Sequence, residues 1–128
     1  MISNVLLDTN IVIAFFANDP AVLMPLQKVR FFVPSIVLGE LYAGARRSGR
    51  PNINLARIDA MIPRDVVLSC DAETAQAYGV IKHGLLAKGR PIPENDIWIA
   101  AVAQQYRLTL ITRDAHFSAI DSLSIESW

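Results

Sequence analysis

Short continuous apolar runs alternate along the chain with longer, mixed segments that favour helices. Such runs are typical of strands in a parallel sheet covered on both faces, because neither side of the strand meets water. The predicted strands are residues 4–7, 31–33, 66–69, 108–112 and 123–125. The predicted helices are residues 10–17, 21–30, 36–47, 55–61, 72–88 and 94–106. This alternation predicts an α/β fold of three layers, in which helices flank a mainly parallel central sheet of four to five strands.

Residues with special roles lie where these helices are expected to begin and end. Ser35 and Asp71 are suited to cap the third and fifth helices. Gly89 suits the end of the fifth helix, and Pro93 suits the first turn of the sixth. The sequence contains no repeat, low-complexity tract or linker, so we expect residues 1–128 to form a single domain.

The composition favours a folded, soluble protein of the cytoplasm. Apolar residues make up 52% of the chain, which argues against disorder. The longest apolar runs, such as residues 11–17, are too short to span a membrane. The N-terminus has no basic segment ahead of a long apolar one, so no secretory signal is expected. Cys70 is the only cysteine, which excludes an internal disulfide and a cysteine-rich zinc site.

Four carboxylates lie beside apolar segments, where a charge needs an explanation. Asp8 ends the first predicted strand and Asp114 follows the fourth, so both are expected at the carboxyl edge of the sheet, where α/β folds bind ligands. Asp96 lies in the first turn of the sixth helix, and Glu40 lies on an apolar face of the third. Ionised groups next to a core are costly unless they are paired or bind a cation. The set predicts a divalent-metal site with oxygen ligands, which suggests phosphate chemistry.

Each carboxylate also has an ordinary explanation. Asp8 could cap the helix near residue 10, and Asp114 could cap a short turn after the fourth strand. Asp96 could be a common first-turn acid. Glu40 is the hardest to explain in this way, because an unpartnered buried glutamate costs several kcal/mol, roughly, or stays protonated. Four independent accidents are a poor explanation of the set, so we expect one cluster.

The motifs around the four acids resemble those of the PIN domain. They are D-T-N after the first strand, G-E-L within the third helix, N-D-I-W-I-A-A at the start of the sixth, and T-R-D-A-H-F after the fourth strand. Among PIN proteins, the short chain and the wording of the motifs are similar to the VapC-type toxins of bacterial and archaeal toxin–antitoxin pairs. The resemblance extends over residues 5–117, nearly the whole chain.

The resemblance implies a metal-dependent endoribonuclease that cleaves single-stranded or loop RNA, often in transfer or ribosomal RNA. By similarity, the acidic cluster would hold Mg²⁺ or Mn²⁺, with Asp8 and Asp96 foremost as direct ligands. Glu40 and Asp114 would complete the cluster directly or through water. The ion would activate a water for hydrolysis of the phosphodiester bond.

Two polar residues near the acids match positions that are polar in the family. Asn10 and Thr112 could bind a metal-held water or orient a carboxylate, although a local turn or cap hydrogen bond explains them equally well. Of the two histidines, neither His83 nor His116 has the partners of a catalytic triad. His116, two positions after Asp114, is the better candidate for the edge of the site.

The charge balance and the resemblance together suggest the partners. Because 12 basic and 12 acidic residues cancel, attraction to RNA must come from bound cations and local basic groups. The candidate RNA contacts are Arg46, Arg47 and Arg113, from a wider set that adds Arg50, Lys82, Lys88 and Arg90. The resemblance also implies a cognate VapB-type antitoxin and a homodimer. Residues 21–29 and 36–42 are candidate docking faces, unless they pack inside the monomer.

Two other functions are weighed against the nuclease. A metal-dependent phosphatase of the haloacid-dehalogenase type also has an aspartate after its first strand, but here the expected second acid of its D-x-D motif is Asn10. A catalytically inactive PIN-like interaction module would be expected to have lost carboxylates, and all four are present. Nucleotide-binding glycine motifs do not occur.

Overall fold

Five parallel strands form the central sheet of the computed structural model, which describes residues 3–128. The sheet order is β3-β2-β1-β4-β5, so β1 lies in the middle. The strands are β1 (Asn4–Leu7), β2 (Arg30–Pro34), β3 (Val67–Leu68), β4 (Thr109–Ile111) and β5 (Ile125–Glu126). Every neighbouring pair in this sheet is parallel. The predicted α/β fold with a parallel sheet is therefore confirmed. The fifth strand, expected over residues 123–125, is present as Ile125–Glu126.

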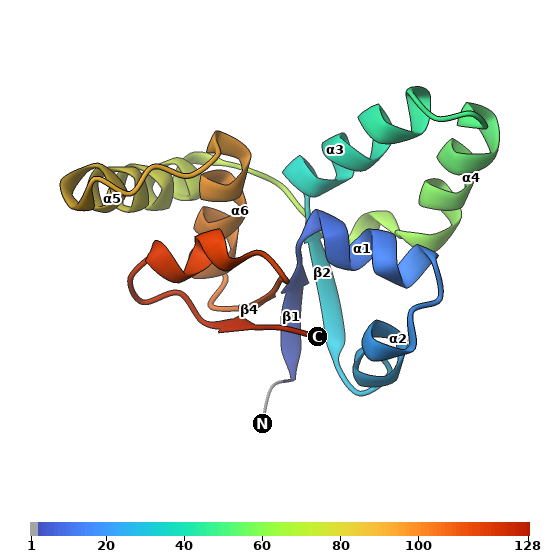
Figure 1. The fold of residues 1–128 in the computed structure, drawn as a ribbon, viewed down its shortest axis with the longest axis horizontal. Helices are drawn as coiled ribbons and strands as arrows, with labels where there is room; N and C mark the ends of the chain where they lie inside the picture. The colour runs from blue at the N-terminus through green and yellow to red at the C-terminus, as the bar shows by residue number, and fades with distance from the viewer. Residues whose placement is uncertain (1–2) are drawn as a thin grey trace.

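Helices precede and follow these strands in the expected order. They are α1 (Thr9–Phe16), α2 (Pro20–Leu26), α3 (Ser35–Arg46), α4 (Pro51–Met61), α5 (Ala72–Lys88) and α6 (Glu94–Gln105). Two 3₁₀ helices are added, η1 (Arg64–Val66) before β3 and η2 (Ala115–Ala119) after β4. In Figure 1 the α3–α4 pair and the α5–α6 pair extend to opposite sides of the sheet, and β1 rises between them. The carboxyl end of β1 thus lies where the two helical pairs diverge.

Two helix boundaries differ from the prediction by four residues, whereas the others agree to within one. The second helix was expected over residues 21–30, but α2 ends at Leu26, and the chain then turns so that Arg30 pairs with Asn4 in the sheet. The register of β2 with β1 therefore overrides local helix preference. The fourth helix was expected from residue 55, but it begins at Pro51, whose fixed φ suits the first helical position.

Two of the predicted helix ends are confirmed. Asp71 and Thr74 form a reciprocal capping box at the start of α5, each side chain accepting a hydrogen bond from the other residue's backbone N–H. Gly89 ends α5 with φ of 64°, a left-handed conformation that suits glycine.

The other two predicted helix ends are wrong by one position. Pro34, not Ser35, is the cap residue of α3, because β2 leads directly into the helix and Ser35 is already its first residue. Pro93 is the residue before α6 rather than part of its first turn. Neither cap residue supplies a side-chain hydrogen bond.

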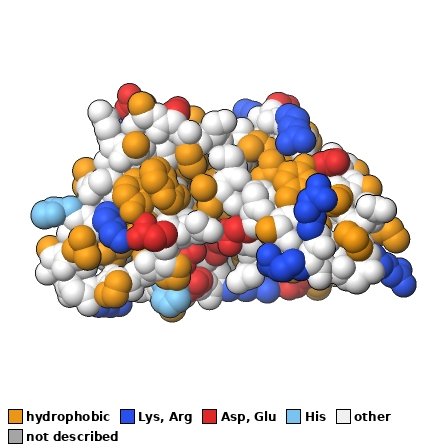
Figure 2. All heavy atoms as spheres, turned by 90° about the horizontal axis from the view of Figure 1, so that it is seen from above, with side chains coloured by type: hydrophobic (Ala, Val, Ile, Leu, Met, Phe, Trp, Pro, Cys, Tyr) orange, Lys and Arg blue, Asp and Glu red, His pale blue; other side chains and the backbone are white. Residues whose placement is uncertain are grey.

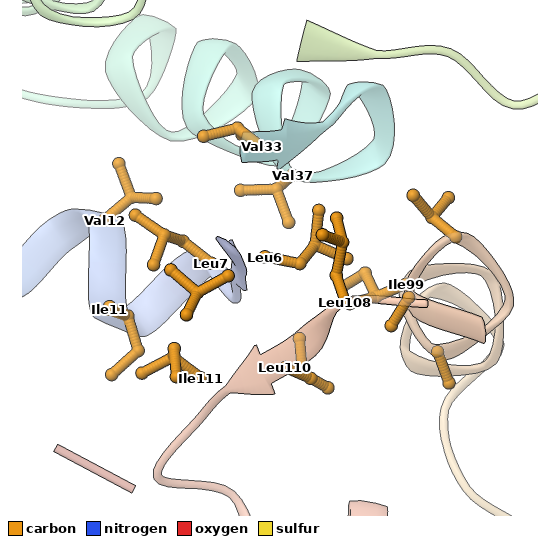
Figure 3. Packing of buried hydrophobic residues seen from close by; sticks show 14 of the residues in the cluster. Leu6, Leu7, Ile11, Val12, Val33, Val37, Ile99, Leu108, Leu110 and Ile111 are labelled. Atoms are coloured by element: carbon orange, nitrogen blue, oxygen red, sulfur yellow. The ribbon is translucent and has the colours of Figure 1, made fainter. Parts of the chain in front are cut away.

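The core lies between the sheet and the helices that cover it. Leu6, Leu110 and Val33 from three strands are fully buried, and Val37 and Ile99 pack onto them from α3 and α6 (Figure 3). Each such side chain stabilises the fold by about 1.5–3 kcal/mol relative to exposure. Helix α6 is buried at residues 97 and 99–103, which fixes its position and that of its acidic first turn.

The two apolar segments considered as docking faces pack mainly inside the protein. Val22 and Leu26 of α2 are buried, as are Val37, Leu38 and Leu41 of α3. Packing within the monomer therefore accounts for these residues, whereas Met24 of α2 is 62% exposed.

None of the helices in the described part of the chain is by itself long and apolar enough to cross a membrane. Only the pair α1 and α2, bent by 99° at its break, reaches that length and composition.

The capping box of α5 gives a direct test of this architecture. Asp71→Ala should lower the free energy of unfolding by about 1 kcal/mol, because it leaves the first N–H groups of α5 without acceptors and removes a hydrogen bond from Gln105 of α6. Urea denaturation followed by circular dichroism measures the change. Gln76→Ala, in an exposed position within α5, is the control and should change stability by less than about 0.5 kcal/mol. Equal effects in both variants would contradict the role of the cap.

Candidate metal centre

The two central strands bring distant acids together at one edge of the sheet. β1 and β4 are parallel neighbours, and the backbone N–H of Asp8 donates to the carbonyl of Ile111 at 3.1 Å. After β1 the chain continues to β2 on one side, whereas β4 lies on the other side of β1. The strand order therefore reverses between β1 and β4. Asp8 and Asp114 therefore follow adjacent strands at their carboxyl ends, the place at which ligands bind in open α/β sheets.

Asp8 is held in place by hydrogen bonds to both of its carboxylate oxygens. Oδ1 accepts from the backbone N–H of Thr9 at 2.8 Å, and Oδ2 accepts from the hydroxyl of Thr112 at 2.7 Å. The side chain is 6% exposed. Burial raises the pKa of Asp8, these two hydrogen bonds lower it, and the charge of Asp114 raises it further. Asp8 thus caps α1, as its ordinary explanation proposed, and also faces the other acids.

Asp96 lies at the centre of the mutual repulsion. Its pKa is raised to about 6, first by burial, then by the negative charges of Asp8, Asp114 and Glu40, while His116 lowers it. The other three predicted acids therefore all act electrostatically on Asp96. Figure 2, which views this edge from above, shows acidic side chains near the middle of the face between two areas rich in hydrophobic side chains.

Glu40 joins the cluster from the side of α3. It is half-buried, and the hydroxyl of Thr9 donates to its Oε1 at 3.0 Å. Thr9 therefore links two of the acids, since its N–H binds Asp8 and its hydroxyl binds Glu40. Sequence reasoning did not single out Thr9, although it lies within the D-T-N motif.

Asp114 is positioned by residues on both sides of it. Its backbone N–H donates to the Thr112 hydroxyl oxygen at 3.0 Å, and its Oδ1 accepts from the backbone N–H of His116 at 2.9 Å. The Thr112 side chain is buried and thus connects Asp8 to Asp114, in line with its predicted supporting role. Asp114 also caps η2, so here again the ordinary and the functional explanation hold together.

The basic and amide residues proposed for RNA or water contacts have different surroundings. Asn10 lies exposed in the first turn of α1, and Arg46 and Arg47 lie exposed at the end of α3. Arg113 forms an ion pair with Asp19 at 3.0 Å and donates to the carbonyl of Trp128 at 2.7 Å. Its guanidinium thus ties the α1–α2 turn to the C-terminus. The roles predicted for these residues stay predictions.

A groove of about 390 Å³ adjoins the acids between α1, α3 and α4. Thr9 and Glu40 form its border with the cluster. Most of its remaining lining is apolar, and its polar members include Asn54 and Arg57 of α4. The sequence offered no signal for these two, because the position of α4 depends on how it packs against α3.

The donor set fits a divalent cation. Carboxylate oxygens are the preferred ligands of Mg²⁺ and Mn²⁺. One ligand atom from each of Asp96, Asp114 and His116 lies within 4.8 Å of the others, a spacing that one ion can bridge. Burial raises the pKa of Asp96 most, and the repulsion by neighbouring acids that raises it further is the kind that a bound cation relieves.

Neutralising Asp96 should stabilise the metal-free protein. Its folded pKa of about 6 exceeds the ordinary value of 3.8, so its contribution to stability is present below the lower value and is lost as pH rises through the upper one. In EDTA, Asp96→Asn should therefore gain about 1–3 kcal/mol relative to the unsubstituted protein between pH 4 and pH 7.5. Urea denaturation across this range measures the difference.

The control for this measurement is Asp65→Asn, an exposed acid in η1, which should show no such trend. Adding Mn²⁺ at pH 7.5 should stabilise the unsubstituted protein more than the Asp96→Asn variant. A variant that is less stable at every pH in EDTA would show that the Asp96 charge is not repelled by its neighbours.

Known proteins match the chain by sequence and by structure. The PIN domain family matches residues 5–123. The chain is 35% identical over 127 residues to the tRNA(fMet)-specific endonuclease VapC of Shigella flexneri, and the aligned region covers 96% of both proteins. It is also similar to solved structures of VapBC2 from Rickettsia felis bound to a DNA fragment from their promoter (TM-score 0.90, 28% identity, 98% of both chains) and of DNA-bound VapBC from Salmonella typhimurium (TM-score 0.88, 34% identity, 100% of this chain and 99% of that one).

These matches confirm the resemblance drawn from the four acidic motifs, since they extend over almost the entire chain and agree in sequence and in fold. The chain belongs to the PIN domain family and, within it, to the VapC ribonucleases.

Proposed function

We propose that this chain is a metal-dependent endoribonuclease, the toxin of a VapBC-type toxin–antitoxin pair, in which Asp8, Glu40, Asp96 and Asp114 hold Mg²⁺ or Mn²⁺. The observation that carries the proposal is the meeting of the four carboxylates at the carboxyl edge of β1 and β4. The relatives named as VapC ribonucleases support the activity.

The chain's own residues prepare this site by fixing the carboxylates before any ligand arrives. Thr112 and the Thr9 N–H hold both oxygens of Asp8, so its lone pairs keep fixed directions. The Thr9 hydroxyl orients Glu40, and the Thr112 oxygen holds the backbone of Asp114. A divalent ion bound by these groups would lower the pKa of a water and neutralise charge on the scissile phosphate. The residues thus supply orientation, which costs no rearrangement when the substrate binds.

RNA must reach the site without help from net charge. Arg57 and Asn54 line the groove next to Glu40, and Arg46 and Arg47 lie exposed about 9 Å further along α3 from Glu40. These side chains offer phosphate contacts on one side of the acids. We include Arg57 in the RNA path because the groove places it near the cluster.

Cleavage of RNA tests the proposed function. Purified protein should cleave total RNA with Mg²⁺ or Mn²⁺ and should lose this activity in EDTA. Asp8→Asn should lower the rate at least about a hundredfold, because the proposed ion stabilises the transition state by several kcal/mol. Asp65→Asn is the matched control and should retain full activity, since it changes an acid far along the chain from the four motifs.

Equal RNA cleavage with metal, in EDTA and by the Asp8→Asn variant would refute the metal-dependent nuclease function. Release of phosphate from a small phosphate ester, with RNA left intact, would instead indicate the phosphatase. Neither reaction, in a folded protein that binds a partner, would indicate the inactive interaction module.

A VapB-type antitoxin is the expected protein partner, since the solved neighbours are VapBC assemblies. The groove between α1, α3 and α4 is the surface that suits it best, because it is largely apolar and is bordered by Glu40 and Thr9. An antitoxin segment laid there would bury apolar surface and lie beside the acids at once. A homodimer remains part of the proposal on family grounds.

Filling the groove should weaken antitoxin binding. Gly44 lines the groove on α3, and a side chain added there would enter open space. Gly44→Phe should therefore fold normally and lower affinity for the cognate VapB-type antitoxin at least about tenfold by steric exclusion. Gly79→Phe, at an equally open position on α5, is the control and should bind normally. Calorimetric titration with the purified antitoxin measures both, and equal affinities would exclude the groove as its binding site.

A further inference from the structure

His116 stands among the acids of the metal centre. Its Nδ1 lies 3.0 Å from Oδ1 and 3.2 Å from Oδ2 of Asp114, and 3.9 Å from Oδ2 of Asp96. The ring is 57% exposed, so ions from solvent can reach it. The only other histidine of the chain, His83, belongs to α5 and lines a separate hollow near Lys88.

The backbone places His116 next to Asp114. His116 follows Asp114 by two residues in η2, and Oδ1 of Asp114 accepts the backbone N–H of His116. This hydrogen bond fixes the backbone of His116 beside Asp114, so the imidazole starts from a point within reach of the carboxylates. Because Nδ1 faces two carboxylate oxygens, either a hydrogen on Nδ1 or a cation has to lie between them, since lone pairs would otherwise face one another.

The spacing of these atoms is that of ligands around one ion. Adjacent ligands of an octahedral ion with bonds of about 2.1 Å are about 3 Å apart, and opposite ligands are about 4.2 Å apart. The distances of 3.0 Å to Asp114 and 3.9 Å to Asp96 fall within this range. A His–Asp ion pair at such an exposed place would contribute little to the stability of the fold, so stability alone does not explain the arrangement.

We propose that His116 is a nitrogen ligand of the metal centre, beside Asp96 and Asp114, and that it makes the site favour Mn²⁺ over Mg²⁺. This inference rests on the proposed function of the same site. Mg²⁺ is a hard ion that prefers oxygen ligands and gives up its waters reluctantly, whereas Mn²⁺ is a softer transition-metal ion that accepts an imidazole nitrogen more readily. An otherwise all-carboxylate cluster thereby acquires a metal preference of its own.

Binding of Mn²⁺ alone, without RNA, tests the proposal. In untagged protein at pH 7.5, pulsed electron paramagnetic resonance should detect the coupling of bound Mn²⁺ to an imidazole ¹⁴N. The coupling should persist in His83→Ala and vanish in His116→Ala and His116→Asn, the last of which places an amide where Nδ1 was. Calorimetry should show Mn²⁺ affinity reduced at least about tenfold in both His116 variants and Mg²⁺ affinity by less than about threefold.

The failures of the two proposals can be told apart. If the unsubstituted protein binds Mn²⁺ without nitrogen coupling, or if the His116 variants keep the same ratio of Mn²⁺ to Mg²⁺ affinity, the histidine is not a ligand and the carboxylate site stands. If Mn²⁺ does not bind, or binds Asp8→Asn equally well, the metal centre itself is refuted and this inference with it. Melting curves in EDTA verify that the exposed substitutions leave the fold intact.

Discussion

Repulsion among carboxylates held beside an apolar core is the constraint around which this structure is arranged. Asp8 is buried at the end of the central strand, and Asp96 begins a helix whose body is buried. Neither can leave the site without disturbing the core. Burial raises the pKa of both groups first, and the charges of neighbouring acids raise it further, Asp114 acting on Asp8 and Asp8, Asp114 and Glu40 acting on Asp96. A fold accepts such a cost at functional sites, where perturbed acids are concentrated.

The scaffold resists this repulsion with a small number of hydroxyl groups. Thr9 and Thr112 each contact two parts of the cluster. Thr112 directly follows β4, and Thr9 is the second residue after β1, the strand that pairs with β4. The hydroxyl of Thr112 donates to Asp8 and accepts from the backbone of Asp114, so it uses both of its capacities. These hydrogen bonds help to hold the like-charged carboxylates near one another.

The sequence was informative where a position follows from strand order and less so where it follows from packing. Asp8 and Asp114 could be placed together because the ends of parallel strands meet at one edge. The end of α2 could not be predicted, because the pairing of Arg30 with Asn4 determines it. The ion pair of Arg113 with Asp19 was not foreseen, because the two residues lie 94 positions apart and no local pattern reveals such a pair. The linking role of Thr9 was missed because its hydroxyl meets Glu40 only once α3 packs beside α1.

Helix α3 connects the two surfaces of the proposed function. Glu40 belongs to the acidic cluster, whereas Leu41 and Gly44, within about one turn of it, belong to the groove. Thr9 borders both as well, from α1. Under the proposed function, a partner in the groove would therefore lie next to a carboxylate of the metal centre without having to penetrate the sheet. Inhibition by an antitoxin would then need only occupation of a preformed surface, since Asp8 and Asp114 are already fixed by hydrogen bonds from residues that the partner need not displace.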